Sequence, residues 1–362
     1  MRRIVILNQK GGVGKTTTTA NVASALARIG HRVLLFDLDP QAHLSLHLGL
    51  DPASGKPGVY ELLTGSTSVA KARVKVASNL WLVGANIDLV AAEVELVGVV
   101  GREVLLRDLL EEHVGNGEKD GRFAKYDYVF FDCPPSLGVL TLNGLCAAHE
   151  VIIPLQPHFL ALQGLGKLLE TVLLVNKRIN PALKVTGVVM CMHDAGTKLG
   201  AEVIEDVRSF LESARGGTVP WSRARLFETM VRRNIKLAES PSYGKSIFDY
   251  APESNGAKDY ERLARELHDP ESLKAAPADS ADTPVTTITT SNNVSPLTEV
   301  PAALQAAEPM PADPLAAEMA KRPGRSRTGR STGLSPVECV ADGLGQGHER
   351  ERLGDEARPC SS

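Results

Sequence analysis

Short apolar runs alternate with longer amphipathic stretches over the first 268 residues of the chain. Mainly apolar runs, typical of strands buried on both faces, occupy residues 4–7, 33–36, 80–83, 126–132, 151–155 and 185–192. Helical patterns occupy residues 15–29, 59–63, 88–97, 102–113, 137–148, 159–178, 197–212 and 254–267. This alternation predicts an α/β fold with one doubly wound, mostly parallel sheet flanked by helices.

The composition changes near residue 269. Residues 275–320 are rich in Ala, Pro, Thr and Ser and hold few large apolar side chains, so burial cannot offset the entropy lost on ordering. We therefore expect a folded domain over 1–268 and a disordered tail over 269–362. A basic run at 321–330 is compatible with nucleic-acid contact and equally with a solvated charge run.

Net charge and cysteine use give few signs of a partner. The net charge of −3 means that any contact with nucleic acid or membrane must come from a local patch. Five cysteines without CxxC spacing indicate reduced thiols, not a disulfide framework or metal site. The start of the chain does not resemble a signal peptide, and no apolar run approaches the roughly 20 residues of a membrane span. We expect a cytoplasmic protein that does not bind membranes.

The most informative stretch is Lys10-Gly11-Gly12-Val13-Gly14-Lys15-Thr16-Thr17, which directly follows the first apolar run. Glycines let the backbone bend around a phosphate chain and direct its N–H groups at it, and a helix beginning near Lys15 adds its positive dipole end. Lys15 is expected to reach the β- and γ-phosphates, and Thr16 to bind Mg²⁺. A chance glycine turn is disfavoured because a strand precedes it and a helix follows.

Carboxylates stand at the ends of two predicted strands. Asp37 and Asp39 follow the run 33–36, and Asp132 ends the run 126–132 in a Walker B arrangement. Open α/β sheets bind ligands at the carboxyl ends of their strands, so these side chains are candidates for supporting Mg²⁺. The alternative, helix caps or turns, is disfavoured because the glycine loop lies one strand–helix unit away.

The loop departs from the common phosphate-binding pattern, because Gln9 replaces a glycine and Lys10 adds a second lysine at its front. This deviant form resembles the ParA and MinD family of ATPases. The resemblance runs across residues 3–265 and is carried by residues 8–17, 37–41, 127–136, 140–145, 233–242 and 256–263. It is strongest to the Soj-like partition ATPases.

The resemblance implies a role for each matching residue. Lys10 would cross a dimer interface to the partner subunit's nucleotide, and Asp39 would position the attacking water. Asp37 and Asp132 would support the metal with Thr16. Contacts to ATP would come from Lys10, Gly11, Gly12, Val13, Gly14, Lys15, Thr16 and Thr17, with Asn234 as a candidate base contact. Phosphoryl transfer suits this division of tasks, since it needs charge neutralisation and an aligned nucleophile.

The same resemblance implies an ATP-dependent DNA-segregation enzyme associated with the nucleoid. ATP would drive a sandwich homodimer that binds DNA without sequence preference, and a ParB-like centromere-binding partner would trigger hydrolysis. Candidate DNA contacts are Arg208, Arg232, Arg233 and Lys236, each of which is equally compatible with an ordinary surface cation. The chain departs from the family pattern at Arg232, where many relatives have proline, and at Pro157-His158-Phe159, where an acidic residue and an aromatic are usual.

Three alternatives share the same core. A MinD-like membrane-cycling ATPase needs an amphipathic basic helix at its end, but 259–267 is mixed in charge. A relative of the nitrogenase iron protein would ligate a cluster with paired cysteines, and Cys133 and Cys146 have no matching partner. A ParA-like ATPase that positions a non-chromosomal cargo stays open, because the ATPase core does not name its partner.

Overall fold

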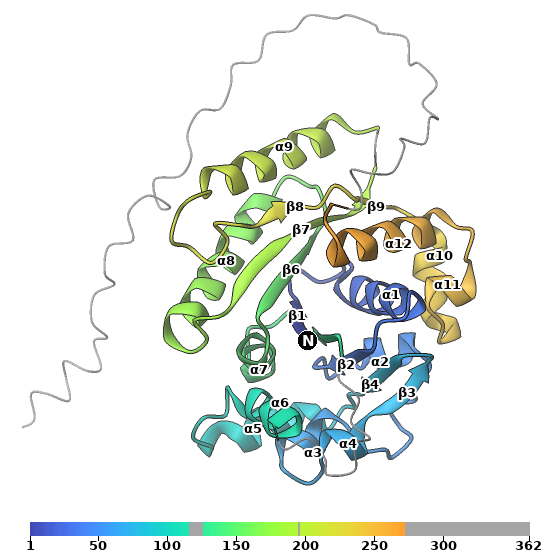
Figure 1. Cartoon of the computed structure of the whole chain (residues 1–362), viewed down its shortest axis with the longest axis vertical. Coiled ribbons are helices and arrows are strands. Elements are labelled where there is room, and N and C mark those ends of the chain that lie inside the picture. Colours follow the sequence, from blue (N-terminus) through green and yellow to red (C-terminus); the bar gives the residue numbers. More distant parts are fainter. Residues whose placement is uncertain (116–125, 195, 272–362) are drawn as a thin grey trace, which may run out of the picture. The chain divides into compact units, whose positions relative to one another are not determined.

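A single mostly parallel sheet forms the centre of the computed structural model, which describes residues 1–115, 126–194 and 196–271 (Figure 1). The strands are β1 (Arg2–Ile6), β2 (Val33–Asp37), β3 (Val74–Ala77), β4 (Leu80–Val83), β5 (Tyr128–Asp132), β6 (Glu150–Leu155), β7 (Lys184–His193), β8 (Arg225–Leu226) and β9 (Val231–Arg232). Their order is β3-β4-β2-β5-β1-β6-β7-β8, and β9 pairs with β7. The expected doubly wound α/β fold is confirmed.

Helices cover both faces of this sheet (Figure 1). One face carries α1 (Lys15–Arg28), α2 (His43–His47), α10 (Ile235–Glu239), η2 (Ser240–Tyr243), α11 (Ile247–Tyr250) and α12 (Asn255–His268). The other carries α3 (Val59–Leu63), α4 (Val69–Ala72), α5 (Leu89–Glu95), η1 (Leu96–Gly98), α6 (Leu105–Gly115), α7 (Val139–Ala147), α8 (Ala161–Arg178) and α9 (Lys198–Ser213).

The strands are apolar on both sides because each side faces a different core. In β1, Ile4 and Ile6 pack under α1 and α12, whereas Val5 packs on the opposite face. Successive side chains of a strand point to opposite faces, so one continuous apolar run serves two cores. β2 and β5 show the same alternation, and their in-register pairing places the ends of the two strands side by side.

The main difference from the sequence-based expectation lies at one edge of the sheet. β3 pairs with β4 in the antiparallel direction through a turn in which Asn79 has a φ of 57°. The half-exposed run Val74–Ala77 is too short and too mixed to show a strand pattern. β8 and β9 also show no strand pattern in the sequence, because each has only two residues.

The expected disordered tail and its basic run at 321–330 fall outside the described residues beyond 271. The boundary at 268/269 coincides with the end of α12 and stays a prediction. Among the described helices, none combines the length and apolar character needed to cross a membrane.

Candidate active site

The glycine loop joins β1 to α1 and takes a shape that requires glycine at two positions. Gly12 and Gly14 have φ values of 73° and 92°, in the left-handed region that costs other residues free energy. Gly14 also caps α1 without a side chain, which leaves the first N–H groups of the helix open to an anion. A Cβ built on Gly11 or Gly12 would meet no atom within 4 Å, so the loop faces open space.

Lys15 lies inside the loop, not on its surface. Its side chain is buried, and Nζ donates to the backbone carbonyl of Lys10 at 3.2 Å. Burial lowers the pKa of Lys15, and the charges of Asp132 and Asp39 oppose that shift. The ammonium is therefore held where the loop would surround a phosphate chain, close to the carboxylates.

Asp37 and Asp132 lie directly beside each other, because β2 and β5 pair in register at these two residues. Both side chains are fully buried. Asp132 accepts hydrogen bonds from Thr16 Oγ1 at 2.7 Å and Thr19 Oγ1 at 3.0 Å. Asp37 accepts from the backbone N–H and the hydroxyl of Ser45, both at 2.8 Å. Two carboxylates are thus concentrated at the start of α1.

Burial shifts the pKa of both carboxylic acids upward. Burial raises the pKa of Asp37 to about 8, and the charge of Asp132 adds to the effect. Burial raises the pKa of Asp132 to about 6, although hydrogen bonds from Thr16 and Thr19 oppose the shift. A pair of buried carboxylates beside a hydroxyl is a hard oxygen donor set that suits Mg²⁺, whose charge would stabilise both ionised forms.

Asp39 and Lys10 stand at the outer side of the same edge. Asp39 is about nine-tenths buried; its Oδ1 accepts from the Gln41 N–H at 3.0 Å, and its own N–H donates to Asp37 at 3.2 Å. Lys10 is exposed, and its Nζ lies 2.6 Å from His158 Nε2. The structure thus brings together the loop and all three predicted carboxylates.

Asn234 follows the short strand β9 and precedes α10. It caps α10, and its Oδ1 accepts from the Lys236 N–H at 2.8 Å. The preceding strand β9 pairs with the end of β7, where Val231 is opposite Cys191. Cys191 in turn lies 3.7 Å from the position of a Cβ on Gly14. Val231 is thus linked to the phosphate loop through Cys191, and the base contact of Asn234 stays a prediction.

The four candidate DNA contacts do not form one cluster. Arg208 lies on α9, which covers the opposite face from α10, and pairs with Glu205 at 3.2 Å. Arg232 forms an ion pair with the buried Asp259 at 2.6 Å, and Lys236 pairs with Glu239 at 2.9 Å. Arg233 is exposed, and within the described ranges its side chain makes no hydrogen bond or ion pair. Arg232 is therefore partly engaged within its own subunit.

Two supporting residues at the site were not predicted. Thr19 bonds to Asp132 from one turn after Thr16, and the i, i+3 spacing in the sequence could have identified it. Ser45 bonds to Asp37 from α2, a five-residue helix without a clear sequence pattern. Only the chain's path after β2 brings Ser45 there.

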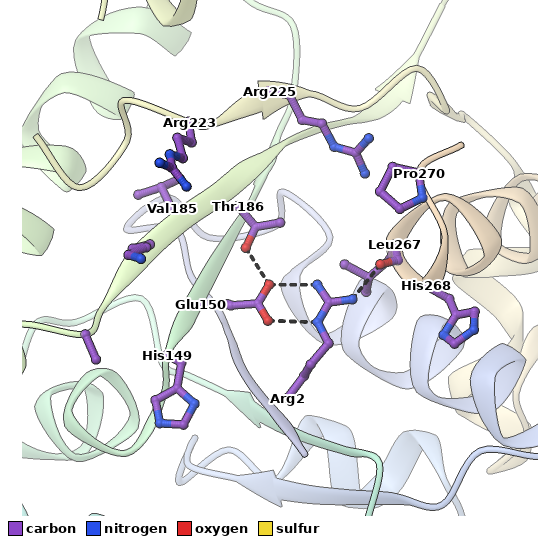
Figure 2. A pocket seen from close by; sticks show the side chains of 12 residues that line it. Arg2, His149, Glu150, Val185, Thr186, Arg223, Arg225, Leu267, His268 and Pro270 are labelled. Atoms are coloured by element: carbon purple, nitrogen blue, oxygen red, sulfur yellow. Dashed lines mark hydrogen bonds and ion pairs between the residues drawn. The ribbon is translucent and has the colours of Figure 1, made fainter. Parts of the chain in front are cut away.

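A cavity of about 710 Å³ lies at the opposite, amino-terminal edge of the sheet (Figure 2). There Arg2 donates two hydrogen bonds to Glu150, at 2.8 and 2.7 Å, and one to the Leu267 carbonyl at 2.6 Å. Thr186 completes the group by donating to Glu150 at 2.7 Å. These groups satisfy each other and hold the end of α12 against the sheet, so they form a structural contact.

The positions of two cysteines and of α12 count against two of the alternative functions, the one similar to the nitrogenase iron protein and the one similar to MinD. Cys133 and Cys146 are buried, so neither is presented for a cluster shared between subunits. The apolar face of α12 is also covered, because Tyr260 and Leu263 pack in the core shared with α1. A membrane-binding role for this helix would require that face to detach.

Comparisons with known proteins identify a family for this chain. Residues 1–185 match the family described as AAA domain. The chain is 43% identical over 265 residues to the sporulation initiation inhibitor protein Soj of Bacillus subtilis, covering 73% of this chain and 97% of that protein. It is 39% identical over 268 residues to the chromosome partitioning protein ParA of Caulobacter vibrioides, covering 74% and 94%.

Among solved structures, cobyrinic acid a,c-diamide synthase from Mycobacterium smegmatis with bound ATP analog and magnesium is 36% identical, with a TM-score of 0.60. The match covers 76% of this chain and 96% of that one. Its two ligands agree with the ATP and Mg²⁺ expected here. With a phosphate loop, strand-end carboxylates and close relatives over the whole folded region, the chain belongs to the ParA/Soj family of chromosome-partitioning ATPases.

Proposed function

We propose that this protein is a DNA-segregation ATPase whose ATP-bound homodimer binds DNA without sequence preference. The observation that supports this most is the meeting of two lysines of one loop with three strand-end carboxylates at a single sheet edge. One lysine is buried in the loop and the other is exposed. A hydrolytic site needs only the first; the second suggests that a partner subunit completes the site.

The residues of the site divide the work of hydrolysis. The N–H groups of residues 11–17 would bind the phosphate chain, and Lys15 would neutralise charge that develops on it. Thr16 with Asp37 and Asp132 would hold Mg²⁺, which supplies charge neutralisation at the β- and γ-phosphates. Asp39 would orient the attacking water, because it is the least buried of the three carboxylates. Asn234 would contact the base.

DNA binding would follow dimerisation. Arg233 is the most available of the candidate cations, and Lys236 lies three residues further along the same exposed segment. In a dimer each cation occurs twice, which doubles the number of phosphate contacts and makes affinity depend on ATP. A ParB-like centromere-binding partner would stimulate hydrolysis and release the dimer from the nucleoid.

The test is ATP-dependent DNA binding, measured by fluorescence anisotropy with a labelled duplex of arbitrary sequence. Wild type should bind only with ATP and Mg²⁺. Lys10→Ala should lose binding by at least about tenfold, because the dimer does not form. Asp39→Ala should bind DNA with ATP but turn over ATP at a small fraction of the wild-type rate. Lys71→Ala, which removes an exposed lysine on α4, is the matched control.

Two results would count against the proposal. DNA binding that is independent of both ATP and Lys10 would reject the partition function. ATP-dependent dimerisation without any DNA binding would instead favour the alternative, a ParA-like ATPase that positions another cargo.

A further inference from the structure

The side chain of Lys10 is held within its own subunit. Its Nζ lies 2.6 Å from Nε2 of His158, in the loop between β6 and α8. Lys15, five residues later, instead points into the phosphate loop. Two lysines of one loop are thus engaged by different acceptors, and only Lys10 is bound to a group outside the loop.

The backbone of Lys10 is anchored so that its side chain can reach His158. Buried Asn8 accepts from the Lys10 N–H at 3.0 Å and donates to the Pro154 carbonyl at 2.7 Å. Pro154 belongs to β6, four residues before His158. Because β1 and β6 are neighbours, Asn8 ties the front of the glycine loop to the segment that carries His158.

The imidazole of His158 is a good acceptor for an ammonium group. Burial and the nearby Lys10 charge lower the pKa of His158. His158 also lies just before α8, where the positive helix end disfavours an imidazolium. The ring is therefore neutral at pH 7 and can accept from the ammonium.

The hydrogen bond between Lys10 and His158 is also easy to break. The Leu160 N–H lies 3.2 Å from Nδ1, and Lys10 lies at Nε2, so both neighbours of the ring are donors. A neutral imidazole has one acceptor nitrogen, so it satisfies only one of them at a time. The shorter, charge-assisted contact to Lys10 is the stronger. However, its loss is partly offset, because Nδ1 then becomes free to accept from Leu160.

We propose that His158 is a positioning residue that holds Lys10 on its own subunit until ATP-driven dimerisation draws the lysine across to the partner's nucleotide. This inference rests on the proposed function, in which Lys10 acts in trans. The neutral histidine holds the lysine without an ion pair. The exchange between subunits would therefore be faster than with a carboxylate.

The contact itself can be tested without nucleotide. The pKa of His158 is measured by NMR titration of its ring in the full chain, in wild type and in Lys10→Met. Removal of the ammonium should raise the pKa of His158 towards its ordinary value of 6.5. Lys71→Met should leave it unchanged. An identical pKa in wild type and Lys10→Met would show that Lys10 is not held there, and would overturn the proposal.

The effect of the Lys10–His158 contact on dimerisation is tested by measuring the rate of ATP-driven dimerisation with stopped-flow light scattering. His158→Ala should dimerise about threefold faster than wild type, the size expected for losing one exposed hydrogen bond. His158→Glu should dimerise more slowly, because a carboxylate holds the lysine more tightly. His158→Gln, whose amide oxygen still accepts, should match the wild-type rate at pH 7. It should lack the faster dimerisation that wild type should show as the pH falls below 6.5 and the ring of His158 is protonated.

The outcomes separate this inference from the proposed function. If Lys10→Ala fails to dimerise and all His158 variants match wild type, His158 has no positioning role and the partition function stands. If Lys10→Ala dimerises and binds DNA like wild type, the proposed function fails. Thermal unfolding of each variant verifies folding, which is expected because both side chains lie at the surface.

Discussion

At the scale of single residues, Asp37 and Asp132 lower the stability of the folded protein and at the same time serve its active site. Each carboxylate is fully buried, and the pairing of β2 with β5 places the two side by side. Hydrogen bonds from Ser45 and Thr16 compensate only in part, because the pKa of both acids stays above its ordinary value. A cation bound between them would remove this cost, which links the stability of the protein to its cofactor.

Asp37→Asn is predicted to change the pH dependence of stability. The pKa of Asp37 rises from 3.8 unfolded to about 8 folded, so the folded state binds more protons and loses stability as pH rises across that window. Without nucleotide, the variant should show a shallower decline from pH 5 to pH 8 and a Tm on the order of 3 °C higher at pH 8. Differential scanning calorimetry measures both.

The control for this experiment is Asp206→Asn, which changes an exposed carboxylate on α9. It should follow the wild-type curve. Addition of ATP and Mg²⁺ at pH 8 should raise the Tm of wild type more than that of Asp37→Asn. Equal pH slopes in wild type and Asp37→Asn would contradict the assignment.

At the scale of elements, the two ends of the folded chain are joined by one polar contact. Arg2 at the start of β1 bonds to Glu150 on β6 and to the Leu267 carbonyl at the end of α12 (Figure 2). The first strand, a central strand and the last helix are thereby joined. Both charged side chains are at least two-thirds buried, so solvent screens the pair only partly.

Glu150→Gln is predicted to lower the free energy of unfolding by about 1–2 kcal/mol, because it weakens a charge-assisted bidentate contact. The pKa of Glu150 is lowered in the folded state despite burial, since Arg2 and Thr186 bond to it. Its contribution is therefore present above the unfolded pKa near 4.5 and is lost as pH falls through the folded value. Urea unfolding at pH 7 and pH 4 measures this.

Glu261→Gln is the matched control, because Glu261 pairs with Arg265 on the exposed side of α12. Its cost should stay below about 0.5 kcal/mol. If both variants lose the same stability at pH 7, the contact at Arg2 has no special role in holding α12.

At the scale of the whole molecule, residues 1–271 contain both core clusters and every residue assigned to the site. A chain ending at Glu271 is therefore predicted to keep its Tm within about 2 °C and to hydrolyse ATP at the full-length rate. It should also keep ATP-dependent DNA binding if Arg233 and its neighbours supply the contacts. Calorimetry, a phosphate-release assay and anisotropy test the three claims.

If the shortened chain lost only its DNA binding, we would assign the DNA contact to the basic run at 321–330 instead. Reversing Arg325 and Arg327 to glutamate in the full-length chain then distinguishes the run from the rest of the tail. A loss of folding would contradict the domain boundary at 268/269 instead.

Much of the fold and of the site is predictable because its signals are local. The phosphate loop is contiguous over residues 10–17, and its glycines, lysine and threonine are required by a phosphate chain wherever the loop occurs. Strands buried on both faces show as continuous apolar runs, and carboxylates at their ends must lie at the ligand-binding edge. Asp37, Asp39 and Asp132 could therefore be assigned to one edge from the sequence.

The tertiary structure alone decided which of these residues touch. Asp37 lies beside Asp132 because β2 pairs with β5, and Lys10 meets His158 because β1 pairs with β6. Arg232 likewise pairs with Asp259 through the packing of α12 beside β9. Strand order and register depend on contacts between residues far apart in the chain, and local patterns of polarity do not encode them.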